Sequence, residues 1–161
     1  MPSGVIAMGR RLLRLEELAL RLGRTALVVL VFAHGVAHSL GFFLPWRAAV
    51  NGTPFDTTLF GGRIDVGTTG MLAVAVLYMA VAIAFVISAI SIASDLAGWP
   101  RWTTGVTVFS LALTVPGWPG TQIGVYLDLA LLALLMVVSW RGVWHASPRP
   151  PREERSPHPT T

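Results

Sequence analysis

The hydrophobic pattern divides the chain into four long apolar stretches separated by short polar or proline-containing breaks. The longest, residues 66–94, contains no charged side chain and exceeds the roughly 20 apolar residues needed to cross a bilayer core. The others are close to residues 25–44, 99–116 and 121–140. A PGWPG sequence forces a turn between the last two, because proline cannot continue a helix. The pattern predicts an all-α integral membrane four-helix bundle whose transmembrane domain covers residues 25–144.

The two ends of the chain differ from this apolar region. Residues 1–24 combine a leucine series with five arginines, so that one side of a helix is apolar and the other basic. This pattern predicts an amphipathic interfacial helix on the cytoplasmic face. The segment is longer than the charged region of a signal peptide, so we expect the first apolar stretch to remain as a span. Residues 145–161 hold five prolines and mixed charge, which predicts a disordered cytoplasmic tail.

The arginines predict the orientation. With both termini in the cytoplasm, ten of the 12 arginines lie inside, and only Arg47 and Arg63 in the 45–65 loop lie outside. The six tryptophans all fall near span ends, as interfacial anchoring predicts. We therefore expect an N-in, C-in protein of the bacterial cytoplasmic (inner) membrane, with the outer loop docked across the mouth of the bundle. The arginines follow this topology, so no nucleic-acid partner is expected.

Composition supports the membrane class and excludes some chemistry. Only 12% of residues are charged and the mean hydropathy is +0.65, whereas a soluble domain carries about 25% charged residues. The chain has no cysteine, which excludes disulfides and thiolate metal sites. Among the charged side chains, Asp128 alone lies well inside an apolar stretch, whereas Arg101 lies near the start of one.

Three ionisable residues inside the spans are the candidate site: His34, His38 and Asp128. An ionisable group in a span is costly, by roughly 2.5–3.5 kcal/mol for Asp at a helix centre, so it faces the interior and finds a partner. His34 and His38 share one helix face, about 15 and 9 Å below the outer end, and Asp128 lies about 10 Å below it. Gly41 and Gly124 lie on the same faces, where they permit close helix packing. We expect these histidines to meet Asp128.

The spacing leaves three roles open for this cluster. The first is a polar clip that fixes helix register. The second is a divalent metal site, since histidines at i and i+4 with a carboxylate suit zinc or a similar ion. The third is proton or solute handling, for which the inner half offers few polar groups, among them Tyr78, Ser88 and Ser91. A haem is not expected, because both histidines share one face.

These features favour a non-enzymatic accessory or binding module. Its partners would be the lipid bilayer and, through the small residues of the second span, a second copy or another membrane protein. The alternative is a metal- or proton-dependent membrane transporter or enzyme that uses the same three residues.

The sequence His34-Gly35-x-x-His38-x-x-Gly41-Phe42 resembles a signature of small uncharacterised bacterial four-span membrane proteins, and more loosely the DoxX-like group. The segments Trp102…Ser110 and Gly124…Asp128-Leu129 are similar to that pattern as well. The resemblance covers roughly residues 25–140 and implies a four-span fold with a shared intramembrane site. This chain departs from the pattern with Pro45-Trp46-Arg47 directly after the first motif.

Overall fold

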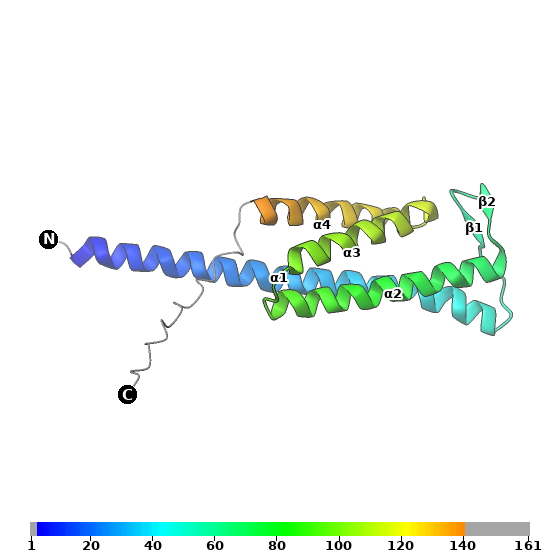
Figure 1. Ribbon diagram of the computed structural model, residues 1–161, viewed down its shortest axis with the longest axis horizontal. Helices are drawn as coiled ribbons and strands as arrows, with labels where there is room; N and C mark the ends of the chain where they lie inside the picture. Colours follow the sequence, from blue (N-terminus) through cyan, green and yellow to red (C-terminus); the bar gives the residue numbers. More distant parts are fainter. Residues whose placement is uncertain (1–2, 141–161) are drawn as a thin grey trace, which may run out of the picture.

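The computed structural model describes residues 3–140, and the side chains of residue 11 and residues 13–140. The predicted tail at 145–161 and the last four residues of the predicted transmembrane domain lie outside this part of the chain. The described chain is helical except for one short hairpin (Figure 1). In chain order its elements are α1 (Ser3–Val50), β1 (Thr58–Leu59), β2 (Ile64–Asp65), α2 (Gly67–Ala93), α3 (Trp99–Thr114), the 3-10 turn η1 (Val115–Gly117) and α4 (Gln122–Trp140).

Three of these helices, α1, α2 and α4, are long and apolar enough to cross a membrane. This confirms the prediction of an all-α chain with membrane-spanning helices. α3 has 16 residues, or about 24 Å at 1.5 Å per residue, which is less than a bilayer core of about 30 Å. Its start at Trp99 agrees with the predicted limit of 99–116, and Gly98, with a φ of 86°, permits the sharp entry into the helix.

α1 differs from the sequence prediction at its outer end. The pattern closed the first span at residue 44, but the helix continues through Pro45 to Val50. Proline removes one backbone hydrogen bond, and membrane helices tolerate it where neighbouring groups satisfy the freed carbonyl. The predicted interfacial segment is helical as well and continues without a break into the span (Figure 1). Its position on the membrane surface stays a prediction, which requires a bend near Gly23.

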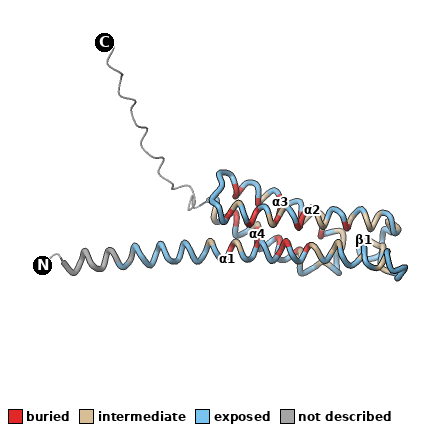
Figure 2. The backbone as a smooth tube through the Cα atoms, turned by 90° about the horizontal axis from the view of Figure 1, so that it is seen from below, coloured by how far each residue is buried: buried red, intermediate tan, exposed pale blue. Residues whose placement is uncertain are grey.

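The four helices alternate in direction, and each packs against the next along the chain (Figure 1). The buried residues lie where these helices meet, while the N-terminal part of α1 extends beyond the other three (Figure 2). The core comprises Leu27 and Val31 of α1 with side chains from every other helix. The helices therefore bury one face inward and expose large apolar side chains outward, as lipid-facing helices do.

Polar contacts join the middle of α1 to the C-terminus of α2. Arg24 of α1 donates from Nε at 2.8 Å to the carbonyl of Ile92 and from Nη2 at 3.2 Å to that of Ala93, at the C-terminus of α2. Its guanidinium also lies 3.5 Å from the carboxylate of Asp95. A cation at this position satisfies carbonyls that the helix leaves unpaired and complements the helix dipole. The middle of α1 and the C-terminus of α2 are thus joined.

Glycines set the distance between α1 and α2. A Cβ on Gly35 would lie 2.8 Å from the Cβ of Phe85, and one on Gly41 would lie 2.7 Å from the ring of Tyr78. A Cβ on Gly124 would lie 3.5 Å from Thr114, an ordinary contact. Gly41 therefore lies at a close helix approach, whereas Gly124 is not tightly packed. Gly35 is a further close-packing position, which the sequence did not single out.

The outer loop folds back over the ends of the helices. Its two strands pair Thr58 with Asp65 and Leu59 with Ile64. The amide of Phe60 donates to the carbonyl of Pro116 at 2.6 Å, which attaches the hairpin to the turn between α3 and α4. The hairpin itself was not predicted, but its attachment to that turn agrees with the predicted docking of the loop.

Candidate functional site

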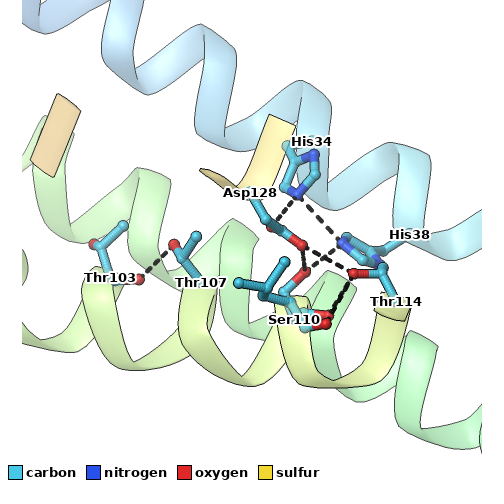
Figure 3. A network of polar contacts seen from close by, with 8 residues as sticks. His34, His38, Thr103, Thr107, Ser110, Thr114 and Asp128 are labelled. Atoms are coloured by element: carbon cyan, nitrogen blue, oxygen red, sulfur yellow. Dashed lines mark hydrogen bonds and ion pairs between the residues drawn. The ribbon is translucent and has the colours of Figure 1, made fainter. Parts of the chain in front are cut away.

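The three ionisable residues from the spans come together in the interior. His34 and His38 lie one turn apart on the buried face of α1, with 6% and 4% of their surfaces exposed, and Asp128 of α4 is fully buried. Figure 3 shows both rings turned toward the Asp128 carboxylate. The histidines of α1 therefore meet Asp128 of α4, as expected. The contact between these two helices is made by the side chains, since α1 packs mainly on α2.

The contacts within this cluster are short. His34 Nε2 lies 2.8 Å from Asp128 Oδ1, and His38 Nε2 lies 3.3 Å from His34 Nε2. Ser110 of α3 donates its hydroxyl to Asp128 Oδ2 at 2.8 Å and lies 2.8 Å from His38 Nε2. The four side chains therefore form a closed ring of polar atoms, in which each group contacts two others.

α3 supplies the groups that the sequence reasoning missed. Thr114 also donates to Asp128 Oδ2, at 3.3 Å, and with Ser110 it belongs to a stripe of four fully buried hydroxyls along α3. The members of the stripe are Thr103, Thr107, Ser110 and Thr114. Their spacing of four, three and four residues puts them on one helix face, a signal present in the sequence.

Aromatic rings of α2 enclose the other side of the histidines. The ring of Phe85 lies 4.8 Å from that of His34, edge to face, and stacks on that of His38 at 5.6 Å. The ring of Tyr78 lies 5.5 Å from that of His38. Tyr78 is therefore part of the cluster's surroundings and not of the inner half, where the sequence reasoning put it. Among the described residues, neither histidine's Nδ1 has a hydrogen-bond partner.

Two other polar residues of α2 form hydrogen bonds within their own helix. Ser88 and Ser91 donate their hydroxyls to the carbonyls of Ala84 and Ile87, each at 2.8 Å, within their own helix. These hydroxyls are thereby satisfied locally and take no part in the cluster.

A cavity of about 530 Å³ connects the histidines with the outer loop. His34 and His38 lie at its inner end, while Asp56 and Thr58 of the loop lie at its outer end. Its walls are mostly apolar and come from all four helices, including Leu40, Met71, Val74, Leu113, Ile123 and Leu127. Asp128 and Ser110 are not part of the lining, so only the imidazoles of the cluster are presented to this space.

The two loop aspartates hold the hairpin over the cavity. Asp56 accepts hydrogen bonds from the amide and hydroxyl of Thr58, and these donors hold the pKa of its carboxyl below the usual range. Asp65 accepts from the Thr57 hydroxyl and the Gly67 amide, with the same effect on its pKa. Both aspartates are therefore ionised at neutral pH and order the loop between the first two helices.

Comparison with protein-family models, with curated proteins and with solved structures finds no match for this chain.

The geometry defines what this site can do. It offers two imidazoles to a largely apolar cavity and keeps a carboxylate and a hydroxyl behind them as hydrogen-bonding partners. Such an arrangement can orient a ligand at the imidazole edge, and its nitrogen and oxygen atoms are of the types that bind transition metals.

Proposed function

We propose that this chain is a small four-span protein of the bacterial inner membrane, with both termini cytoplasmic, that acts as a non-enzymatic binding module. Its ligand occupies the cavity between the outer loop and the two histidines. Known small-molecule pockets have volumes of about 300–1,000 Å³, apolar walls and a few convergent polar groups, and this cavity has all three features.

The topology rests on the alternating helix directions and on the charges. The helices α1, α2 and α4 have the length and apolarity of membrane spans, and α3 runs antiparallel to both α2 and α4. The arginines concentrate at the ends assigned to the cytoplasm. The exposed leucines of α1, from Leu13 to Leu22, would contact the lipid surface on that side.

The cavity supports a ligand with an apolar body and one polar end. The apolar walls favour hydrocarbon or aromatic groups, and the imidazoles of His34 and His38 provide the polar contact at the inner end. Asp128 and Ser110 lie behind these rings and fix their orientation. These contacts support the binding and orientation of a ligand at the imidazoles. Asp128 does not line the cavity and would not contact that ligand.

Substitution of one small residue of the cavity tests this proposal. Ala37 is exposed within the cavity, so Ala37→Phe fills the space next to His38. Ala33, one turn earlier, is also exposed but does not line the cavity, so Ala33→Phe is the matched control. Protein purified from membranes in each form is extracted, and the bound small molecules are identified by mass spectrometry.

We expect a compound other than phospholipid in the wild type and in Ala33→Phe, and at least about tenfold less in Ala37→Phe. Far-UV circular dichroism confirms that all three forms are equally helical. The same compound at equal levels in all three forms, or its absence from the wild type, would contradict the proposal.

A further inference from the structure

The ring of side chains brings three metal-binding groups to one point. His34 Nε2, His38 Nε2 and a carboxylate oxygen of Asp128 all lie within 4.8 Å of one another, and all three residues are buried. The same nitrogen of each imidazole faces inward, so both rings can act as ligands at once (Figure 3). This convergence comes from two separate helices and from residues 94 positions apart.

The surroundings of Asp128 suit a bound cation. Asp128 is contacted by a ring nitrogen and two hydroxyls, all of which can donate hydrogen bonds to its oxygens. Among the described residues, the ion-pair partner of Asp128 is His34. An ionised carboxylate inside a membrane span is costly unless a positive charge lies beside it. A bound divalent ion would supply this charge and leave both imidazoles neutral, as metal ligation requires.

Two of the three separations between the ligand atoms are close to those of a tetrahedral site. Bonds of about 2.0–2.1 Å separate the ligand atoms of such a site by about 3.3 Å, and the two Nε2 atoms already lie 3.3 Å apart. Asp128 Oδ1 lies 2.8 Å from His34 Nε2, so small side-chain rotations bring it into the same sphere. Asp128 Oδ2 keeps its hydrogen bonds from Ser110 and Thr114, which orient the ligand as outer-shell partners do in metal sites.

We propose that His34, His38 and Asp128 bind one divalent first-row transition metal ion, with an open coordination position toward the cavity. Two imidazoles and one carboxylate suit zinc and its neighbours, whereas calcium and magnesium prefer all-oxygen ligands. Only the role of the open coordination position rests on the proposed function, because the polar end of the cavity ligand would bind the ion there. The ion site itself depends on the three side chains.

The experiment measures metal content and coordination in the detergent-purified full chain, with any affinity tag removed. Zinc is loaded and excess is dialysed away, and the bound metal is counted by elemental mass spectrometry. Cobalt(II) is loaded in parallel, because its visible absorption reports tetrahedral coordination. The variants are His34→Ala with His38→Ala, and Asp128→Asn, which retains the shape of the side chain.

Two controls address non-specific binding and misfolding. The double variant His145→Ala with His158→Ala removes the chain's other two histidines and should keep the ion. Thr103→Val changes a buried hydroxyl of the same α3 stripe outside the cluster and should keep it as well. Ser110→Ala should weaken zinc affinity about 10- to 100-fold, the usual effect of losing an outer-shell partner.

We expect one zinc per chain in the wild type and in both controls, and at least about tenfold less in the His34/His38 double variant. Tetrahedral cobalt absorption should follow the same pattern and be lost in Asp128→Asn. Metal below a tenth of an equivalent in the loaded wild type, or metal retained by the double variant, would overturn the inference. The Ala37→Phe variant separates the two proposals, because it removes the cavity ligand and leaves the metal ligands intact.

Discussion

Replacement of Asp128 by alanine is the sharpest test of how the interior is held together. The carboxylate is fully buried and accepts contacts from His34 at 2.8 Å, Ser110 at 2.8 Å and Thr114 at 3.3 Å. Alanine removes the acceptor oxygens of all three donors at once. The three donors differ in the hydrogen-bond partners that remain to them after the substitution, and this difference sets the expected loss in the free energy of unfolding.

His34 loses the most in Asp128→Ala. Its Nε2 keeps only the 3.3 Å contact with the other ring, and an orphaned buried donor costs about 1–3 kcal/mol. Ser110 retains His38 as a partner, and Thr114 retains the carbonyl of Ser110 at 3.0 Å. These two contacts add roughly 0.6 kcal/mol each, the average for polar contacts between membrane helices. The sum is a loss of about 2–4 kcal/mol in the free energy of unfolding.

Asp128→Asn keeps an acceptor for His34 and offers an amide to Ser110, so its loss should be only about 1 kcal/mol. Thr103→Val is the control on the same face of α3: the Thr103 hydroxyl is buried, and among the described side chains it has no hydrogen-bond partner. Its removal should leave stability unchanged or raise it by up to about 1 kcal/mol.

The measurement is a titration with SDS in mixed micelles, followed by far-UV circular dichroism, for the wild type and the three variants. We expect the order Thr103→Val, wild type, Asp128→Asn, Asp128→Ala, from most to least stable. If Asp128→Ala unfolds within about 0.5 kcal/mol of the wild type, the argument that the bilayer forces these groups together is refuted.

Four further predictions test other parts of the structure. Arg24→Ala should lower the free energy of unfolding by about 1–2 kcal/mol, and lysine should restore only part of it, because one ammonium cannot reproduce the forked contacts at the end of α2. In SDS titrations, Gly35→Ala should cost about 1–3 kcal/mol through overpacking against α2, whereas Gly124→Ala should stay within about 0.5 kcal/mol. Since the pKa of Asp65 is lowered in the folded loop, its contribution is present at neutral pH and is lost as the pH falls below about 4, which faster hydrogen exchange of the loop amides should show. A single cysteine at position 51 of this cysteine-free chain should react with an impermeant maleimide in intact cells, and reaction only after permeabilisation would reverse the proposed orientation.

The helices were predictable because apolar length is a strong signal. A stretch without charge over residues 66–94 has few alternatives to a span, and α2 covers almost the same residues. The ends of the helices and the loops between them were harder to predict from local sequence. Proline ends helices in soluble proteins, but Pro45 is tolerated within α1. The hairpin between α1 and α2 depends on a contact with the turn between α3 and α4, which lies far along the chain.

The site was predictable in part. His34, His38 and Asp128 stand out because ionisable residues are rare in apolar stretches, and the cost of burying them predicts that they meet. Ser110 and Thr114 do not stand out, because hydroxyls are common in membrane helices and can bond to their own backbone. The cavity could not be predicted, since it depends on how the outer loop lies over the helices.

The length of α1 has a consequence for how distant parts of the molecule communicate. The helix has 48 residues, or about 72 Å, and carries the exposed leucines at one end and the two imidazoles further along. Because the helix is continuous through Gly23, a change in the tilt of its N-terminal part would also move the imidazoles relative to α4, with Arg24 as the pivot. Occupancy of the cluster and the tilt of the N-terminal part of the helix would then influence each other equally in both directions.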